Sequence, residues 1–406
     1  RRLTNYRPTQ GARFQAALAA HSEPDGDTED CESLPVPTEA RVGLHTRRHQ
    51  TLLRLLGEGF PDLARTRIVD LGCGDGALTA ALAERGADVL GIDADEFCRM
   101  SGVTTSVDTG SAGPGNWAGF RKHVIEPSQA RILAYLHVSF AGIYGFSKTV
   151  MVGESEDIRL MAPAECAEVA DANRDYIVGI KVRVGRHASG DQGTAPLDMA
   201  LQVANEVGMP LMCHIDHPPP SYEEVLDMLR PGDVLTHAFR PFPNSPATAQ
   251  GTVKPAVLAA RKRGVIFDIG HGKGSFAFKT ARAMLANGFE PDTISSDVHQ
   301  LCIDGPAFDQ VTTMSKFLCL GMNLYDVVKT STLNAGMALK RPEYGSLKVG
   351  SLGDATILTV REGKFDYVDV LGEHLIGNQK IVSEGVVLKG KWWHPRRTNK
   401  FPRHKG

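Results

Sequence analysis

The sequence has little of what marks disulfide-rich, membrane-spanning or nucleic-acid-binding proteins. Only seven of its 406 residues are cysteine, and no two are spaced as Cys-x-x-Cys. This argues against a disulfide framework or a structural zinc knuckle and predicts the reducing cytoplasm as the compartment. No uninterrupted apolar run approaches the roughly 20 residues that a membrane helix needs. The formal net charge is only -2, so we expect neither nucleic acid nor a membrane among its partners.

Four short apolar runs each end in a side chain that can bind a divalent metal. The residues in question are Lys181, His214, His237 and Asp297. Their spacing suits one, one and two strand–helix units, and the carboxyl ends of parallel strands in a barrel converge on one mouth. A single strand-end histidine is more often structural, and a buried lysine usually meets an acid. Four candidates at the same relative point of four strands nevertheless indicate a metal site.

The chemistry of these side chains suits hydrolysis. Imidazoles and a carboxylate bind zinc-like cations, and Asp297 can also take a proton from the attacking water as the catalytic base. Lys181 can join only as a neutral amine or as a carbamate formed with CO2, and burial would lower its pKa in that direction. Weaker candidates for substrate binding are His271, which could polarise a carbonyl, and His217 and Arg240, which could recognise a carboxylate.

Strands and helices alternate between residues 104 and 297. Strands are expected at residues 104–108, 131–138, 177–180, 210–213, 233–236, 264–268 and 293–296. Helices are expected at residues 164–174, 196–206, 222–229, 256–263 and 276–286. This alternation over about 250 residues predicts an α/β fold, a (β/α)8 TIM-like barrel at residues 94–340, in which Ile68–Leu71 could supply the missing strand.

The regions on either side of the barrel have a different character. A helix is expected at 325–339, and strands at 355–360, 365–370 and 379–391 predict a small β-subdomain at residues 341–392. Residues 1–48 are polar and predict a poorly ordered arm, and residues 393–406 predict a basic tail.

A glycine-rich turn lies before the barrel, between two expected strands. The segment Arg67–Gly76, with glycines at 72, 74 and 76, is followed by a strand that ends at Asp93. It resembles the first motif of the S-adenosylmethionine-dependent methyltransferases, in which the acid binds the cofactor ribose. Because the pattern stops after Asp93, residues 49–93 are interpreted as a methyltransferase-like βαβ fragment. The alternative function is a methyltransferase that uses Asp70 to Asp93.

A second resemblance covers about residues 92–390. The motifs that carry it are Asp93–Cys98, Ser101–Thr105, Asp108–Gly113, Val178–Arg183, His214–Pro220, Asp233–His237, Phe267–Gly272, Thr312–Phe317 and Gly350–Ala355. Together they resemble the metal-dependent amidohydrolase superfamily, in its dihydroorotase-like amidohydrolase/deacetylase branch. The resemblance implies a TIM barrel with a flanking β-sandwich, here an incomplete one formed by the C-terminal strands.

The same resemblance implies the chemistry of the site. One or two divalent ions, usually zinc, would be held by carbamylated Lys181 as a bridging ligand, by His214 and His237 on one metal, and by Asp297 as ligand and general base. Metal-activated water would cleave an amide, a cyclic amide or an acyl ester of a small molecule. A homo-oligomer is left open.

The sequence departs from this family at the end of the first barrel strand. Where the family carries a His-x-His pair, Asp70-Leu71 is followed by Gly72-Cys73-Gly74. One explanation is a fusion of the barrel to a methyltransferase fragment, natural or through a faulty gene model. The other is a diverged relative whose site is reduced to one metal. Either way we expect impaired activity, and a catalytically inactive barrel is a further alternative.

Overall fold

The computed structural model describes residues 67–71, 88–92, 94–146 and 150–394. The chain divides into two compact units, one of residues 1–93 with 396–406 and one of Ala94–Pro395. In the first unit, β1 (Arg67–Leu71) and β2 (Asp88–Ile92) form a two-stranded parallel sheet. The predicted arm, the glycine turn at 72–76, Asp93 and nearly all of the basic tail lie outside the described residues.

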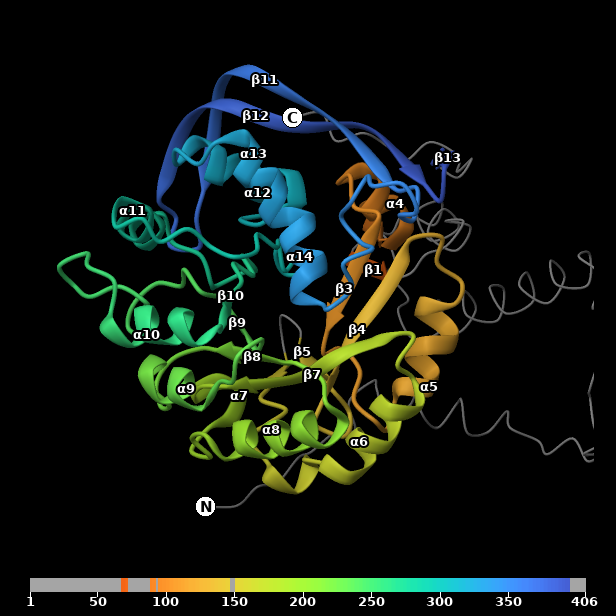
Figure 1. The fold of residues 1–406 in the computed structure, drawn as a ribbon, viewed down its shortest axis with the longest axis vertical. Helices are drawn as coiled ribbons and strands as arrows, with labels where there is room; N and C mark the ends of the chain where they lie inside the picture. The colour runs from red at the N-terminus through yellow and green to blue at the C-terminus, as the bar shows by residue number, and fades with distance from the viewer. Residues whose placement is uncertain (1–66, 72–87, 93, 147–149, 395–406) are drawn as a thin grey trace, which may run out of the picture. The chain divides into compact units, whose positions relative to one another are not determined.

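The second unit is built on a curved parallel sheet of six strands with the order β10-β9-β8-β7-β4-β3. The strands are β3 (Thr105–Thr109), β4 (Arg131–His137), β7 (Ile177–Val184), β8 (Leu211–Ile215), β9 (Val234–Thr236) and β10 (Ile266–Phe267). Figure 1 shows the strands following one another around an arc in chain order. These are six of the seven strands expected from the sequence, and the α/β TIM-like fold is confirmed.

The seventh expected strand, at residues 293–296, is present only as an isolated bridge. Asp268 bridges Thr293 in parallel, and the backbone N–H of His271 donates to the carbonyl of Ser295 over 3.2 Å. The segment therefore continues the arc beyond β10. In the described ladders this segment pairs with a neighbour on one side only. The extended backbone ends at Asp297, which has a left-handed conformation (φ 44°).

The strand expected at Ile68–Leu71 is found, but not in the barrel sheet. β1 hydrogen-bonds to β2, with Arg67 opposite Asp88 and Leu71 opposite Ile92. The six-stranded sheet does not contain it. That this segment supplies the missing barrel strand stays a prediction, and within its own unit the hydrogen bonds of β1 go to β2.

Helices pack against the outer side of the sheet, as Figure 1 shows for α6 and α8. The five expected helices are confirmed as α6 (Pro163–Ala172), α8 (Ala195–Val207), α9 (Tyr222–Met228), α10 (Pro255–Arg263) and α11 (Phe278–Ala286). The expected helix at 325–339 is divided into α13 (Leu324–Ser331) and α14 (Leu333–Ala338). The remaining short helices are α4 (Ala94–Met100), α5 (Trp117–Phe120), the π-helix η2 (Arg121–Ile125), the 3-10 helix η3 (Ile158–Leu160) and α7 (Arg186–Ser189).

One buried helix was not expected from the sequence. α12 (Gln310–Cys319) packs against β12, and its Lys316 and Phe317 are fully buried. A lysine on the inner face interrupts the apolar pattern that normally reveals a buried helix, and the β-branched Val311, Thr312 and Thr313 lower the helix propensity of the segment.

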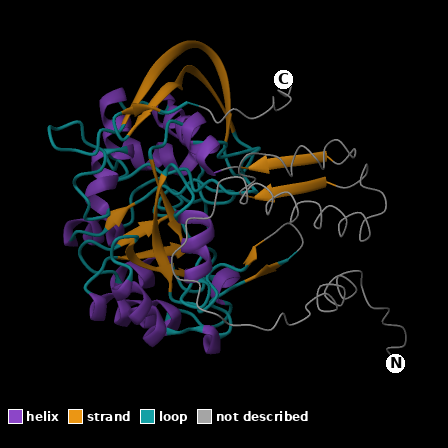
Figure 2. Ribbon diagram, turned by 90° about the vertical axis from the view of Figure 1, so that its right-hand side faces the viewer, coloured by secondary structure: helices purple, strands orange, loops and turns teal. Residues whose placement is uncertain are grey.

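The C-terminal strands form one antiparallel sheet of three strands, β11-β12-β13. The expected strands at 355–360 and 365–370 are a single strand, β11 (Ala355–Val368), because an irregularity between Glu362 and Phe365 lets the ladder continue. β12 (His374–Leu388) and β13 (Lys391–Trp392) follow. Figures 1 and 2 show the long hairpin of β11 and β12 arching over the helices of this half. Within the described residues there is a single layer here, so the sandwich stays a prediction.

The second unit also contains a small sheet. β5 (Gly145–Phe146) and β6 (Met151–Val152) form a two-stranded antiparallel sheet.

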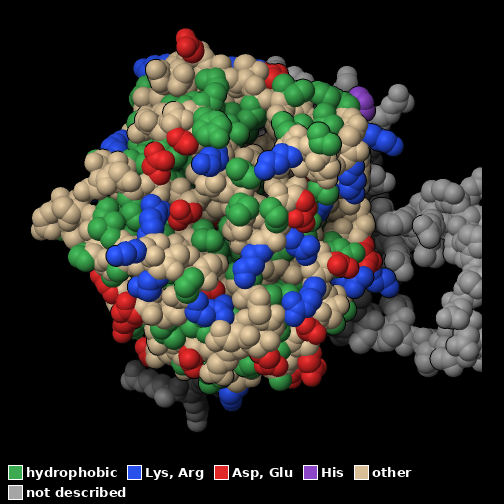
Figure 3. All heavy atoms as spheres, viewed as in Figure 1, with side chains coloured by type: hydrophobic (Ala, Val, Ile, Leu, Met, Phe, Trp, Pro, Cys, Tyr) green, Lys and Arg blue, Asp and Glu red, His purple; other side chains and the backbone are tan. Residues whose placement is uncertain are grey.

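Basic and acidic side chains are both spread over the face shown in Figure 3. Among the described residues, no helix is long and apolar enough to cross a membrane.

Gly179, in the middle of β7, has no side chain, and this allows the ring of Tyr135 and the backbone at Pro210 to approach β7 closely. A Cβ at this position would lie 2.3 Å from the ring of Tyr135 and 2.6 Å from the carbonyl oxygen of Pro210. Because β7 is paired on both edges, we expect Gly179→Ala to lower the free energy of unfolding by about 1–3 kcal/mol. Denaturant unfolding followed by circular dichroism measures this. Gly119→Ala is the control, since Gly119 is exposed with nothing within 4 Å of its Cβ position, and equal losses in the two variants would contradict the packing argument.

Candidate metal centre

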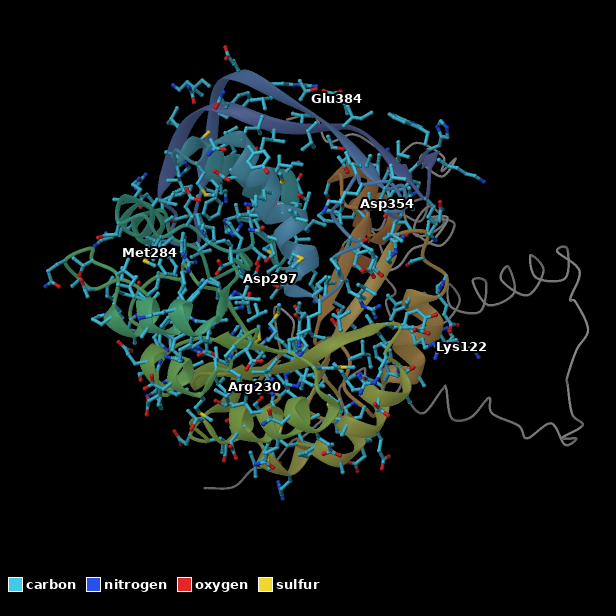
Figure 4. The ribbon with its side chains drawn as sticks, in the orientation of Figure 1. Lys122, Arg230, Met284, Asp297, Asp354 and Glu384 are labelled. Atoms are coloured by element: carbon cyan, nitrogen blue, oxygen red, sulfur yellow. The ribbon has the colours of Figure 1, made fainter. Side chains whose placement is uncertain are left out.

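The four predicted ligands lie at the carboxyl side of the sheet. Lys181 is on β7 and His214 is on β8, while His237 follows β9 directly. Asp297 follows the bridged segment at 293–296, and Figure 4 shows it in the interior of the fold. The charge of Lys181 acts on the pKa of each of the other three residues. The structure therefore brings all four side chains into one neighbourhood.

The two histidines are aimed at the same point. His237 Nε2 lies 2.6 Å from His214 Nδ1, with the rings at 86° to each other. His237 Nδ1 lies 2.6 Å from the carbonyl oxygen of Gly270, so this nitrogen carries the proton and donates it. Nε2 is then left with a lone pair, which accepts a hydrogen bond from His214 Nδ1 in this structure. Burial is the main cause that holds the pKa of both histidines well below the ordinary value. Both rings are therefore neutral at physiological pH, which is the state that binds a metal.

Lys181 is only 2% exposed. Burial lowers its pKa to about 8, although the charge of Asp297 acts in the opposite direction. A substantial fraction of this amine is thus unprotonated in mildly alkaline solution, as reaction with CO2 would require. The backbone fits closely around it, since a Cβ on Gly110 would lie 2.8 Å from Lys181 Cγ.

Asp297 and His237 each have a strained backbone conformation. Asp297 has φ 44° and His237 has φ 67°, in the left-handed region that non-glycine residues rarely adopt. Such residues cost about 1–3 kcal/mol each and cluster at functional sites. Burial raises the pKa of Asp297 to about 6, against the opposing charges of Lys181 and Arg183. Gly272 packs on this carboxylate, because a Cβ there would lie 2.4 Å from Asp297 Oδ2.

A buried charged network lies beside Lys181. Glu154 Oε1 is 3.1 Å from His137 Nε2 and 3.1 Å from Arg183 Nε. The side chains of Glu154 and His137 are almost fully buried, and that of Arg183 is 11% exposed. Sequence reasoning missed Glu154 and Arg183. Arg183 could have been found, because alternation along β7 puts it on the same face as Lys181, whereas Glu154 lies in a loop without a periodic pattern.

A third missed residue, Asp268, connects the last strands through hydrogen bonds. It accepts hydrogen bonds from the hydroxyls of Thr236 (2.7 Å), Thr293 (2.7 Å) and Ser295 (2.8 Å). These hydroxyls come from β9 and from the segment that leads to Asp297. Asp268 therefore fixes the spacing between the strand ends that carry His237 and Asp297.

The three predicted substrate-binding residues are placed less favourably. His271 is fully buried, its Nε2 lies 2.7 Å from Lys316 Nζ, and burial lowers its pKa to about 3. Arg240 is 3% exposed, and its Nη1 donates to the carbonyl of Ile215. Only His217 is exposed, with its ring edge-on to His187 at 4.9 Å. Substrate binding by these residues stays a prediction.

The described residues suit a site for a single cation. Two imidazoles meet at 2.6 Å, and a lysine and a carboxylate come from neighbouring strand ends, near enough for the charge of Lys181 to act on the pKa of the other three residues. Residues 72–74, where the family carries its second pair of histidines, are outside the described part of the chain. The donor set of two nitrogens and a carboxylate is one that zinc binds well.

Several known proteins resemble this chain. It is 35% identical to a deacetylase of Brucella anthropi over 71% of each chain. It is also 35% identical to a deacetylase of Agrobacterium fabrum, over 71% of this chain and 70% of the other. Among solved structures, a dihydroorotase has a TM-score of 0.69 at 33% identity and covers 75% of this chain and 80% of its own. An adenine deaminase has a TM-score of 0.71 at 27% identity and covers 81% and 85%.

A different protein matches a short segment of the chain. The ubiquinone biosynthesis O-methyltransferase of Methylococcus capsulatus is 52% identical over 57 residues, which are 12% of this chain and 24% of that enzyme. The match supports the resemblance of a fragment to a methyltransferase and extends no further. No family model matches the chain.

Proposed function

The chain belongs to the amidohydrolase superfamily, and we propose that it is a metal-dependent hydrolase that removes an acyl group from a small molecule. The bond cleaved would be an amide, a cyclic amide or an acyl ester. The observation that carries the proposal is the pair of neutral imidazoles. His214 Nδ1 and His237 Nε2 face each other at 2.6 Å, and the carbonyl of Gly270 fixes the tautomer of His237.

The residues present fit one divalent cation, with zinc the best match. His214 Nδ1 and His237 Nε2 would hold it, together with Asp297 and Lys181, the latter as its carbamate. When bound, the ion would supply a Lewis acid to polarise the acyl carbonyl. The strained backbone at His237 and Asp297 (φ 67° and 44°) supports this assignment, because such strain persists where the surrounding structure holds side chains in place for function.

Asp297 would manage the proton of the reaction. With its pKa raised to about 6 by burial, its carboxylate is unprotonated at neutral pH and can accept a proton from the attacking water. The same shift makes the acid a better donor, so the proton can pass to the leaving nitrogen or oxygen. Asp297 lies against Gly272, where a Cβ would clash with Oδ2, and this contact limits the orientations of the carboxylate.

The substrate class follows from the same residues and is also part of the proposal. The site would take small N-acyl or O-acyl compounds or cyclic amides. The exposed His217 could contact a polar group of the substrate. Arg240, buried behind His217's loop and bonded to Ile215, would act through its charge. His271 would order the loop beside Asp297. Methyl transfer is not proposed, since the methyltransferase match covers 24% of that enzyme.

Metal content tests the proposal directly. Elemental analysis of the purified full chain is expected to find about one tightly held divalent ion per chain. His237→Ala is expected to lose most of it, because the imidazole with the fixed tautomer is removed. Catalytic release of an acyl group, measured on a panel of N-acyl and O-acyl compounds, should fall in parallel.

The matched control is His374→Ala. His374 is exposed and pairs with Asp366 on the surface of the hairpin, so its loss should leave the metal content unchanged. Wild-type protein that holds no zinc, iron, manganese or cobalt after mild purification would overturn the proposal. Metal that binds as expected, with no compound of the panel cleaved, would favour the catalytically inactive barrel.

A further inference from the structure

A second group of metal-ligating side chains lies on neighbouring loops, outside the four proposed ligands. His187 is in α7, which follows β7, and Asp216 and His217 follow β8. One ligand atom from each residue can be chosen so that all three lie within 4.8 Å of one another. Both imidazoles are exposed, while Asp216 is only 8% exposed. The group thus opens to solvent above a buried carboxylate.

The loops that carry these residues are tied together. The backbone N–H groups of His187 and Ala188 donate to the two carboxylate oxygens of Asp216, each over 3.1 Å. The N–H of Arg186 donates to the carbonyl of His217 over 2.8 Å. Gly185 (φ 130°) makes the approach possible, because a Cβ there would lie 2.3 Å from Asp216 Cγ. The carboxylate is therefore held in place before any ligand arrives.

The two exposed rings are arranged around that fixed carboxylate. His187 Nδ1 lies 3.4 Å from Asp216 Oδ1, and the rings of His187 and His217 meet edge-on with centroids 4.9 Å apart. In a tetrahedral zinc site, ligand atoms are about 3.4 Å from one another, as follows from metal–nitrogen distances of roughly 2.0–2.1 Å. Rotation of exposed imidazoles can close the remaining gap without movement of the backbone.

We propose that His187, Asp216 and His217 form a second divalent-cation site, which we call the rim site, with zinc as its preferred ion. Two imidazole nitrogens and one carboxylate oxygen are three ligands suited to zinc, and water from the exposed side can supply the fourth. Asp216 stands between the two sites, because its other oxygen, Oδ2, is 3.8 Å from His214 Nε2. We call the site of Lys181, His214, His237 and Asp297 the inner centre. The rim site does not depend on the proposed hydrolase activity, since it uses none of these four residues.

The competing reading is an anion site, because Arg186 and Arg240 lie nearby. Arg186 donates through Nε to the carbonyl of Pro218 over 3.3 Å, and Arg240 is buried and bonded to Ile215. Both guanidinium groups are thus at least partly engaged with backbone carbonyls. The carboxylate at the centre of the group would repel an anion and attract a cation. The geometry therefore favours a cation.

Equilibrium dialysis of the full chain against zinc chloride tests the rim site. Wild-type protein is expected to bind one ion more per chain than the double variant His187→Ala/His217→Ala. Cobalt(II) provides a second readout, since the d–d absorption of the ion at the rim should be missing from the spectrum of this variant. Asp216 is left unchanged in the test, because its contact with His214 would disturb the inner centre as well.

The control is His123→Ala/His374→Ala, which also removes two exposed imidazoles. It is expected to bind as much zinc and cobalt as the wild type. Zinc stoichiometry and cobalt spectrum that are identical in the wild type and the His187→Ala/His217→Ala variant would overturn the rim site, as would an equal loss in the control. His237→Ala separates the two proposals: it should lose the inner ion and keep the rim ion, so failure of one proposal leaves a result distinct from failure of the other.

Discussion

Asp297→Asn is expected to lower kcat/KM for deacylation by about 10²- to 10⁴-fold, the range over which a positioned general base contributes. The amide keeps the shape of the side chain but cannot accept the proton of the attacking water. Because burial raises the pKa of Asp297 to about 6 and so favours its uncharged form, an uncharged amide of the same shape should not unfold the chain. The measurement is the release of amine or alcohol from the best compound of the acyl panel.

The matched control is Asp304→Asn. Asp304 is exposed on the loop that follows Asp297, and its substitution should change kcat/KM by less than twofold. The thermal midpoint and the circular dichroism spectrum of both variants establish that the fold is kept. If Asp297→Asn retains full activity with an intact fold, the role of this carboxylate as base is wrong, even if the metal assignment holds.

The positions of the four proposed ligands at strand ends could be predicted because the signal for each is local. A run of apolar residues ends and a polar residue follows, as at His214 after Leu211–Cys213. Parallel strands then bring the strand ends together without any further information from the sequence. The same reasoning gave six strands and five helices of the second unit, since each is a short periodic segment.

The residues that support the centre could not be predicted in this way. Asp268 receives three hydroxyl groups from two other segments, and this pattern exists only after the strands are in register. Lys316 is fully buried and donates to the carbonyls of Pro306 and Val368 (2.7 and 2.8 Å) besides contacting His271. In the sequence this lysine is a charge that argues against a buried helix. In the folded chain its ammonium group donates hydrogen bonds to carbonyls that are distant in the sequence.

The burial of two of the three proposed substrate-binding residues could not be predicted from their positions in the sequence. Arg240 follows His237 closely in the chain, yet its guanidinium is buried and faces the backbone of Ile215. His271 lies in a glycine-rich loop that looked open, but it is stacked on Phe276 at 4.7 Å and bound by Lys316. The direction of a side chain that follows a strand end depends on the conformation of the loop. The residues next to Arg240 and His271 in the sequence do not determine that conformation.

Glu154→Gln is expected to lower the free energy of unfolding by about 3–5 kcal/mol, as breaking a buried ion pair from one side generally does. Glu154 contacts His137 and Arg183, each at 3.1 Å. Burial alone would raise the pKa of Glu154, but the charge of Arg183 and the hydrogen bond to His137 outweigh it and the pKa is lowered. A carboxylate with a lowered pKa stabilises the fold above its unfolded pKa. The difference between wild type and variant should therefore shrink as the pH falls through the acid range.

Glu384→Gln is the control that separates the effect of burying an ion pair from the effect of removing a negative charge. Glu384 also pairs with an arginine, Arg361, at 3.0 Å, but the two side chains are 42% and 58% exposed, and Figure 4 shows Glu384 on the outer hairpin. Its loss should cost no more than about 1 kcal/mol, because water already screens an exposed pair. Adding Arg183→Met to Glu154→Gln should recover part of the stability, since it removes the cation whose carboxylate was taken away. If the double variant is less stable than Glu154→Gln alone, the cost lies in packing rather than in the charge of Arg183.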